Sequence, residues 1–542
     1  TNNMTDYQFS SRRSPVMGRN GTVATSQPLA TAAGLSILAA GGNAADAAVA
    51  TAAALNVTEP TSTGIGGDMF ALYYDAKTKQ VTALNGSGRA PAALSLERLQ
   101  KENIKELPPF HPYTITVPGA CAGWFDLIEK HGTLPMQKIL APAINLAENG
   151  FPVAPITAHF WERGAGRQLQ SALNGHELTI DGRAPKAGEI FSNKGLARTF
   201  RKIAQDGKKA YYEGEIAESI AQVIQQSGGC LTTADLAAHH STWDEPISVN
   251  YRGYRIWECP PNGQGLAALL ALNLLEGFDL ASLAPLSTRR LHLQIEAMRL
   301  AFADARWYVS DPAFSSIPLN ELLSKAYSDE RRKLINLKKA TLDQKHGTPI
   351  KSSGTVYFSV VDKDGNACSF IISNYMGFGT GIVPKGWGFT LQNRGHNFNL
   401  EADHPNSLQP NKRPYHTIIP AMATREEDGS LYASYGVMGG FMQPQGHMQV
   451  ACALIDDGMD PQTALDMPRF CIEPTEDGGF ASLEEGIPDK TIAALTRHGH
   501  PTRKISGWER ALFGRGQVIV RERSGVLVAG SDSRADGCAM TL

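Results

Sequence analysis

The adjacent residues Gly354 and Thr355 are the part of the sequence whose types most directly suggest chemistry. They close a cluster of small side chains, Ser352-Ser353-Gly354-Thr355, and open a segment that alternates like a strand. If the bond between them is broken, Thr355 carries a free α-amine, with a pKa near neutrality, beside its own hydroxyl. The amine can take the hydroxyl proton, so one residue supplies both the nucleophile and the base.

Breaking that bond is the same chemistry carried out within the chain. The Thr355 hydroxyl attacks the carbonyl of Gly354, and the resulting ester is hydrolysed. Glycine at 354 lowers the cost of the strained turn that this attack requires. The alternative is purely structural, because threonine is a good strand residue and a Ser/Gly cluster before a strand commonly forms a loop. From these residues alone, the structural interpretation is the more frequent one.

Other groupings of reactive residues give weaker signals. The carboxylates of Glu258, Asp68 and Asp46 offer acid–base chemistry, but nothing in the sequence sets their separation. The glycine-rich stretches 64–68 and 86–91 lack the spacing and the following lysine of a phosphate-binding loop. The seven cysteines are scattered, with no CxxC and no Cys/His cluster, so no metal and no cofactor are expected.

The segments that follow Gly354 predict the elements that position Thr355. Residues 355–362 and 367–373 are predicted to be strands joined by a hairpin turn, in which Asp-Gly supplies residues tolerant of positive φ. Both faces of the first strand are largely apolar, so its sheet should be covered on both sides. Further strands are predicted at 430–437, 516–522 and 525–532.

The segment 28–56 is alanine-rich and predicts a pair of helices interrupted at Gly41-Gly42. Asn43 is a natural N-cap for the second helix, and Asp46 lies in its first turn, where a negative charge is favourable. Helices with such small side chains can pack closely against a sheet.

The rest of the large N-terminal part is mainly helical. Residues 59–75 predict a glycine turn followed by a strand, and 81–91 a second strand that ends in a loop. From about 120 to 345 the pattern is mostly helical, apart from a strand that enters the Pro/Gly turn within 250–265. Residues 338–354 are polar and lack periodicity, which indicates an exposed linker.

Length and composition bound the class of protein. A chain of 542 residues holds two or three domains or one large layered fold. Apolar residues make up 42% and charged residues 19%, as in globular proteins with a sizeable core. The net charge of −2 gives no reason to expect nucleic acid or an anionic membrane as a partner. The lack of a transmembrane run or a secretion signal, with the scattered cysteines, favours a cytoplasmic location.

The segment from Thr355 resembles the start of the small subunit in the γ-glutamyltranspeptidase family of N-terminal-nucleophile hydrolases. In that family a proenzyme cuts itself before a threonine that opens a T-x-x-x-S-V-V strand, as in 355–361. The resemblance covers nearly the whole chain in ordered blocks, among them "GTVATSQPLATAAG", "YTITVPGACAGW", "LAPAINLAENGFPV", "GFGTGIV", "KRPYHTIIPAM" and "GVMGG". It implies an α+β fold, the four-layer αββα sandwich, with residues 1–354 as the large subunit and 355–542 as the small subunit.

The resemblance also implies roles for single residues. Thr355 falls on the nucleophile, so the cleavage site is Gly354–Thr355, and Ser373 falls on a hydroxyl residue that hydrogen-bonds the nucleophile. Gly439 and Gly440 fall on paired glycines whose backbone N–H groups form the oxyanion hole. Donors fixed where charge develops usually contribute most to acyl-transfer catalysis. Without the resemblance, Gly-Gly after a strand would be a plain turn.

The substrate pocket departs from that of the true transpeptidases. Their arginine for the substrate α-carboxylate aligns with Ser87, and Arg89 lies two residues away. Their acidic residue for the substrate α-ammonium aligns with Asn397. An asparagine of their pocket aligns with Tyr375.

Three further substitutions alter the pocket, and one of them adds a permanent positive charge. Its paired serines become His416 and Thr417, and Arg394 replaces a neutral or acidic side chain. A pocket that loses a carboxylate and gains a guanidinium should disfavour an amino group and favour an anion, which arginine holds through two parallel hydrogen bonds. The alternatives are a surface ion pair for Arg394 and a hydrogen-bonded structural role for His416. A general-base role for His416 is not needed, because the amine of Thr355 fills it.

Together these features predict a self-processing amidohydrolase for a small acidic amide without an α-amino group. The resemblance to oxamate amidohydrolases of purine breakdown suggests oxamate, which would yield oxalate and ammonia. The alternatives are a γ-glutamyl hydrolase or transpeptidase acting on glutathione, a glutaryl-type (cephalosporin) acylase, and an uncut, proenzyme-like binding protein. The expected partners are the substrate and the two subunits of one precursor, which can pair as a homodimer of heterodimers. No nucleic acid or membrane partner is expected.

Overall fold

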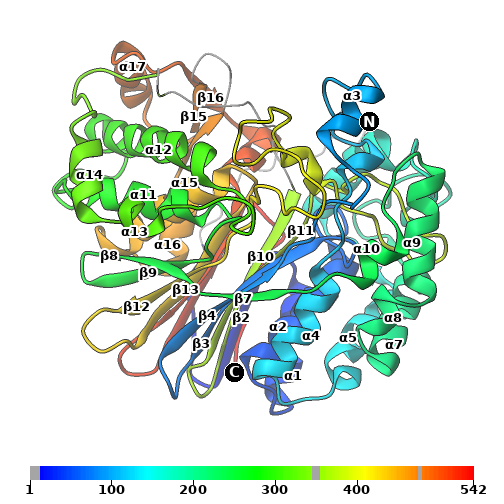
Figure 1. Ribbon diagram of the computed structural model, residues 1–542. Coiled ribbons are helices and arrows are strands. Elements are labelled where there is room, and N and C mark those ends of the chain that lie inside the picture. Colours follow the sequence, from blue (N-terminus) through cyan, green and yellow to red (C-terminus); the bar gives the residue numbers. More distant parts are fainter. Residues whose placement is uncertain (1–12, 343, 345–353, 474–478) are drawn as a thin grey trace, which may run out of the picture.

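Two seven-stranded sheets lie face to face between two layers of helices (Figure 1). The computed structural model describes residues 13–342, 344, 354–473 and 479–542. The Ser352-Ser353 cluster and most of the predicted linker lie outside the described residues. The order of layers, helix–sheet–sheet–helix, is that of the predicted α+β sandwich.

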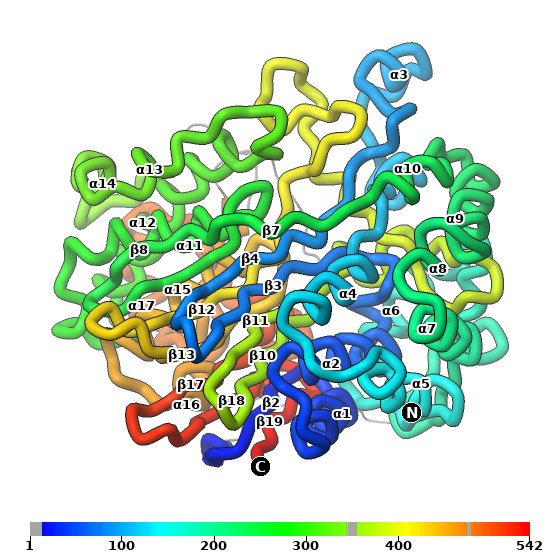
Figure 2. The backbone as a smooth tube through the Cα atoms, turned by 60° about the horizontal axis from the view of Figure 1, so that its bottom comes forward, coloured from blue at the N-terminus to red at the C-terminus, as the bar shows by residue number. Residues whose placement is uncertain are grey.

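The two sheets each combine strands from before and after Gly354. The Thr355 sheet consists, in spatial order, of β19 (Cys538–Thr541), β2 (Gly21–Thr25), β10 (Gly354–Asp362), β11 (Ala367–Tyr375), β3 (Asp68–Asp75), β4 (Gln80–Gly86) and β7 (Thr242–Asp244). The facing sheet consists of β1 (Val16–Gly18), β18 (Leu527–Ser531), β17 (Arg515–Arg521), β13 (Leu431–Met438), β12 (Ala421–Arg425), β9 (Tyr254–Glu258) and β8 (Ile247–Tyr251). Figure 2 shows β2 and β19, from opposite ends of the chain, side by side.

Helices cover the outer face of each sheet. The layer over the Thr355 sheet includes α1 (Pro28–Ala39), α2 (Ala44–Thr58), α4 (Ala120–His131), α5 (Met136–Asn149), α6 (Pro155–Gly164), α7 (Lys194–Asp206), α8 (Lys209–Tyr212), α9 (Glu215–Gln226) and α10 (Thr233–Ala237). The layer over the facing sheet includes α11 (Gly265–Leu275), α12 (Thr288–Tyr308), α13 (Leu319–Leu322), α14 (Lys325–Arg332), α15 (Met442–Ile455), α16 (Pro461–Asp466) and α17 (Asp489–Arg497). In the described ranges no helix is both long and apolar enough to cross a membrane.

Smaller elements complete the fold. The helix α3 (Leu96–Lys101) carries the N-cap Ser95. Two short strands, β5 (Phe151–Pro152) and β6 (Ile190–Phe191), pair with each other. A third sheet is formed by β14 (Phe470–Glu473), β15 (Phe480–Glu484) and β16 (Thr502–Ile505).

The alanine-rich helices form as predicted. They are separated at Gly41-Gly42, and Asn43 and Asp46 make a reciprocal capping box at the start of α2. Every residue of α2 is buried, because its small side chains let it pack between the sheet and neighbouring helices.

The strand β10 is covered on both faces, as its apolar pattern predicted. Tyr357 and Val361 point into the core between the two sheets. Val356 and Phe358 point into the core between the Thr355 sheet and its helices. The hairpin to β11 turns at Gly365, whose φ of 84° is readily adopted only by glycine.

Candidate active site

Thr355 lies at the start of β10, where the pairing with β11 shifts register between Gly354 and Val356. An irregularity of this kind re-aims a side chain relative to a regular strand. The Thr355 side chain is buried, and its Oγ1 lies 3.0 Å from the Oγ of Ser373. The same Ser373 oxygen accepts a hydrogen bond of 2.8 Å from the backbone N–H of Tyr375. The structure thus brings together the two hydroxyls that the sequence analysis paired.

The facing strand β13 crosses the interior opposite β10. The Oγ atoms of Ser359 and Ser434 are 2.9 Å apart across the two sheets. Nearer to Thr355, the Tyr357 ring packs directly on Gly436, where an added Cβ would lie 2.5 Å from it. The two strands therefore run in opposite directions where they face each other: Ser359 lies opposite Ser434, and Tyr357 lies opposite Gly436. If the same alignment continues past the register shift at Gly354 and Val356, Thr355 comes opposite the end of β13.

The turn that follows β13 is formed by Gly439 and Gly440, with φ values of 132° and 59°. These conformations favour glycine, and a Cβ at Gly439 would also lie 3.2 Å from the Cα of Gly514. Neither glycine N–H donates a backbone hydrogen bond within the described part of the chain. Two adjacent N–H groups of this kind are what an oxyanion hole requires, and their direction relative to Thr355 stays a prediction.

Gln264, which the sequence analysis did not single out, fixes this turn. Its Nε2 donates hydrogen bonds of 2.9 Å to the carbonyl of Gly440 and 2.6 Å to the carbonyl of Thr417. Its Oε1 accepts a hydrogen bond of 2.9 Å from the Tyr415 hydroxyl. No local pattern marks Gln264, because Thr417 and Gly440 lie 153 and 176 residues along the chain from it.

Arg394 is buried rather than exposed in a surface ion pair. Its Nη1 donates a hydrogen bond of 2.6 Å to the Thr417 hydroxyl, and its Cζ lies 4.3 Å from the centroid of the Tyr375 ring. Its Nε and Nη2 have no hydrogen-bond partner among the described residues. Burial lowers the pKa of Arg394 to about 10, so the side chain still carries its charge at neutral pH. The site therefore contains a charged guanidinium with unused donors.

Tyr375 supports that guanidinium from a strained position. Its φ is 79°, a value that bulky residues rarely adopt and that costs on the order of 1–3 kcal/mol. The bond from its N–H to Ser373 lies in the same turn, so one backbone conformation sets both the ring under Arg394 and the hydroxyl beside Thr355. Asn397 lies one helical turn after Arg394, is buried, and has an amide group without a partner in the described residues.

His416 has Asp68 as its partner. The His416 Nε2 lies 2.9 Å from Oδ2 of Asp68, whose Oδ1 accepts a 3.2 Å hydrogen bond from the N–H of Gly119. Asp68 faces Ser373 in the pairing of β3 with β11. Burial raises the pKa of Asp68 to about 7, opposed in part by Arg394. Burial also lowers the pKa of His416 well below its usual range, so the imidazole is neutral.

The three carboxylates considered in the sequence analysis do not form one acid–base pair. Asp68 belongs to the site through His416. Glu258 instead lies 2.7 Å from the Nδ1 of His447. Asp46 serves the capping box of α2. Only Asp68 is therefore placed to influence Thr355.

Arg89 lies apart from these residues. Its Nη1 donates a hydrogen bond of 3.1 Å to the carbonyl of His240, and no contact in the described chain joins it to Thr355 or Arg394. Ser87 is buried and donates a hydrogen bond of 2.7 Å to Asn85. The position that aligns with an arginine of the transpeptidases is thus filled by a serine, whose backbone carbonyl accepts a hydrogen bond of 3.0 Å from the buried Arg413.

A group of residues that could bind a metal ion lies outside the candidate active site, where α12 packs near the loop after α17. Within the described ranges, His292, Glu296 and His500 form a buried group whose ligand atoms lie within 4.8 Å of one another. No local sequence pattern marks this group, because His500 is distant from the other two residues along the chain.

Comparison with known sequences relates the chain to one family. A family model for gamma-glutamyltranspeptidase matches residues 30–542. The chain is 36% identical over 529 residues to the glutathione hydrolase-like YwrD proenzyme of Bacillus subtilis, covering 97% of this chain and 99% of the other. It is 32% identical over 523 residues to the oxamate amidohydrolase proenzyme of Klebsiella pneumoniae, covering 94% and 96%.

A solved structure resembles this chain in both fold and sequence. The crystal structure of a cephalosporin acylase from Bacillus halodurans superposes with a TM-score of 0.92 and 45% sequence identity. The match covers 100% of this chain and 99% of that chain. The four-layer arrangement and nearly every element around Thr355 are therefore shared with a known hydrolase structure.

Proposed function

Because the chain belongs to the gamma-glutamyltranspeptidase family of N-terminal-nucleophile hydrolases, whose members are autoprocessed and act on amide bonds, we propose that it hydrolyses half-amides of dicarboxylic acids. Oxamate, the half-amide of oxalic acid, is the shortest such substrate. A glutaryl amide is a longer one. In both, the acyl group carries a carboxylate and no α-amino group.

The proposed reaction begins with cleavage between Gly354 and Thr355. The freed α-amine of Thr355 takes the Oγ1 proton while Oγ1 attacks the substrate carbonyl carbon. The N–H groups of Gly439 and Gly440 stabilise the oxyanion, and Ser373 orients the attacking hydroxyl. The leaving amine departs with the proton, which gives an ester on Thr355. Water, deprotonated by the same α-amine, then attacks the ester and releases the dicarboxylic acid.

The single observation that carries the choice of substrate is the environment of Arg394. A charged side chain buried without a carboxylate partner is costly, and its cost is offset when an anion binds. The Nε and Nη2 atoms of Arg394 form one edge of the guanidinium and have no partner in the described residues. A substrate carboxylate can accept two parallel hydrogen bonds from such an edge.

The same surroundings disfavour a γ-glutamyl substrate. Its α-ammonium group requires an acceptor, and the aligned position holds the neutral amide of Asn397. Asp68 is the nearby carboxylate, but its two oxygens already contact His416 and Gly119. An ammonium placed between Asn397 and Arg394 would also be repelled by the guanidinium.

The comparisons support this class of substrate without choosing the acyl length. The likeness to an oxamate amidohydrolase supports the shortest acyl group, and the likeness to a cephalosporin acylase supports an acylase-type amide without specifying the acyl length. The glutathione hydrolase-like relative favours the rival, a γ-glutamyl hydrolase.

The proposed cleavage leaves two chains that remain together. Both the Thr355 sheet and the facing sheet contain paired strands from both sides of Gly354. Separation of residues 1–354 from 355–542 would expose the strand edges and the core between the sheets. We therefore propose a stable heterodimer. A cytoplasmic location stays a prediction, which cell fractionation would test.

Hydrolysis of four amides by the purified protein tests the proposed function. Hydrolysis of oxamate is measured as released ammonia. Hydrolysis of the glutaryl, γ-glutamyl and butyryl p-nitroanilides is measured as the absorbance of released p-nitroaniline. We expect kcat/KM for oxamate or the glutaryl anilide to exceed that for the butyryl anilide by at least about 100-fold, because the neutral acyl group leaves Arg394 unpaired. Preference for the γ-glutamyl anilide would instead assign a γ-glutamyl hydrolase. A protein that stays uncut and hydrolyses none of the four would be the binding protein.

A further inference from the structure

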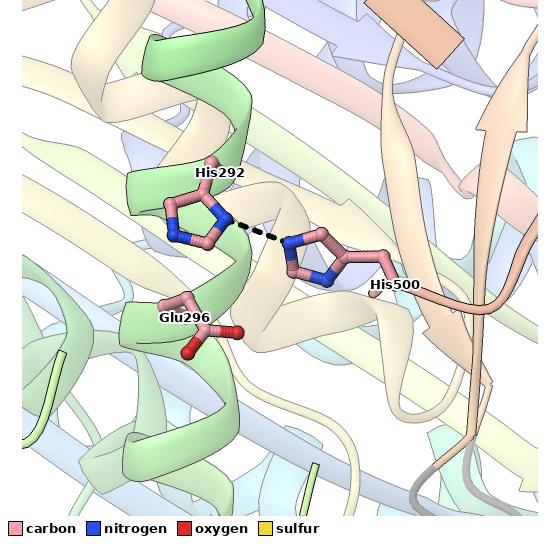
Figure 3. Close-up of side chains that lie close together, drawn as sticks. All are labelled: His292, Glu296 and His500. Atoms are coloured by element: carbon pink, nitrogen blue, oxygen red, sulfur yellow. Dashed lines mark hydrogen bonds between the residues drawn. The ribbon is translucent and has the colours of Figure 1, made fainter. Parts of the chain in front are cut away.

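His292 and Glu296 project from the same face of α12 toward His500, which lies in the loop between α17 and β16 (Figure 3). The first two are four residues apart, the spacing that aligns side chains on one side of a helix. All three side chains are buried, and the His292 Nδ1 lies 2.8 Å from the His500 Nε2. No residue of this group takes part in the chemistry proposed for Thr355.

The contacts around the group direct lone pairs toward its centre. The Nε2 of His292 lies 2.7 Å from the carbonyl of Asn336, so it carries the proton and leaves Nδ1 unprotonated. The Oε2 of Glu296 accepts a hydrogen bond of 3.1 Å from the N–H of Thr341. Its Oε1 accepts none from the described residues. The atoms that meet at the centre are therefore the Nδ1 of His292 and the Nε2 of His500, which share one hydrogen bond with each other, and the Oε1 of Glu296. A metal ion would take the place of the proton in that hydrogen bond.

We propose that His292, Glu296 and His500 bind one divalent transition-metal cation of the zinc class. Two histidines and one carboxylate are a common protein ligand set for such ions. Bonds of about 2.0–2.2 Å around a tetrahedral ion separate its ligands by roughly 3.3 Å. The present atoms lie within 4.8 Å of one another, with the two nitrogens at 2.8 Å. Slight separation of the rings and a small rotation of Glu296 complete the geometry.

The competing arrangement needs no metal. In it Glu296 is paired with Arg299, and the two imidazoles share one proton. The ion pair joins the Nε of Arg299 to the Oε1 of Glu296 at 3.7 Å, a separation too long for a hydrogen bond. The Oε1 of Glu296 can therefore still form a shorter bond to a metal cation.

The proposed metal site has a structural role at the end of the large subunit. Asn336 and Thr341, which hold the ligands, precede the proposed cleavage site, and the Ala340 N–H also donates a 2.7 Å hydrogen bond to the carbonyl of His498. His500 belongs to the other side of that cleavage site. If the chain is cut as proposed above, the metal joins the two subunits.

Zinc binding by the full-length protein tests the site. Chelator-stripped protein is titrated with ZnCl₂ against a chromophoric chelator, and retained zinc is counted by mass spectrometry after gel filtration. Glu296→Gln is the principal variant, because its amide oxygen can still accept the Thr341 hydrogen bond while the charge is lost. His500→Gln removes a second ligand, and the exposed His176→Gln is the matched control for adventitious surface binding.

We expect one zinc per chain, with affinity lowered at least about 100-fold in Glu296→Gln and His500→Gln and unchanged in His176→Gln. Cobalt substitution should give ligand-field absorption that both ligand variants lose. Wild-type protein that retains no zinc, or Glu296→Gln that retains it as tightly, would overturn the proposal. The titration is repeated with Thr355→Ala, which has no catalytic activity under the proposed function. Since zinc binding needs no turnover, its result there tests the metal site independently of the proposed function.

Discussion

The Oγ1 of Thr355 and the Oγ of Ser373 lie 3.0 Å apart on adjacent strands, and both side chains are buried. We expect Ser373→Ala to lower kcat about tenfold, the equivalent of one lost hydrogen bond of about 1.4 kcal/mol, and to slow self-cleavage similarly. Single-turnover kinetics and a cleavage time course measure the two effects. Ser369→Ala is the matched control, because Ser369 is a buried serine of the same strand that contacts Tyr357 instead. Equal effects of both variants would mean that Ser373 has only a structural role.

Thr355→Ala should abolish both self-cleavage and amide hydrolysis, because no other hydroxyl takes the place of Oγ1. Intact-mass spectrometry of the wild type should show two fragments that divide between Gly354 and Thr355. Thr355→Ser keeps the nucleophile and should still cut itself, more slowly. Cleavage of Thr355→Ala at the same bond would remove Thr355 from the mechanism.

Arg394→Met should separate the recognition of the anion from catalysis. Methionine fills much of the same space over Tyr375 but offers no donors. We expect KM for the substrate with an acyl carboxylate to rise about 100-fold, while hydrolysis of the neutral butyryl anilide changes little. We also expect the unfolding free energy to rise by about 1–3 kcal/mol, since a buried and unpaired charge is removed.

Arg198→Met is a suitable control for that experiment, because Arg198 also lies over an aromatic ring, that of Trp387, with its Cζ 4.0 Å from the centroid. It is not part of the candidate site, so KM should not change. A fall in kcat for every substrate in Arg394→Met, without a change in KM, would contradict a role in binding the carboxylate.

Asp68→Asn should change how stability depends on pH. The pKa of Asp68 is about 7 in the folded protein, raised by burial from 3.8. Folding therefore favours the protonated form, and this contribution is complete below pH 4 and lost as pH rises to 7. The loss amounts to at most about 4 kcal/mol. Asp68→Asn should consequently be more stable than the wild type at pH 8, and the difference should shrink toward pH 5.

Chemical denaturation in the Thr355→Ala background measures this effect on a single uncut chain. Asp403→Asn, at an exposed aspartate, should keep the wild-type pH dependence. Identical slopes for Asp68→Asn and wild type between pH 5 and 8 would show that Asp68 does not titrate in that range. Activity should also fall in Asp68→Asn, because the amide changes the charge beside Ser373.

Much of the local structure could be predicted because its signals are short-range. The alternation after Gly354 predicted β10 and β11, and Gly365 marked the turn between them. Asn43 and Asp46 marked the start of α2, where the capping box forms within four residues. The resemblance of ordered blocks predicted the layered fold, which the family match and the acylase structure confirm.

The sequence by itself thus determined the elements, the family and the candidate nucleophile, since each depends on residues that are neighbours along the chain. Tertiary structure decided which distant groups share the site. Asp68 meets His416 across 348 residues, and His292 meets His500 across 208. Tertiary structure also decided that Arg394 is buried against Tyr375, whereas Arg89 contacts His240 outside the candidate site. The physical reason is that long-range contacts depend on how the sheets stack and on the register of their strands. Burial then sets the charge state of the ionisable side chains that these contacts bring together.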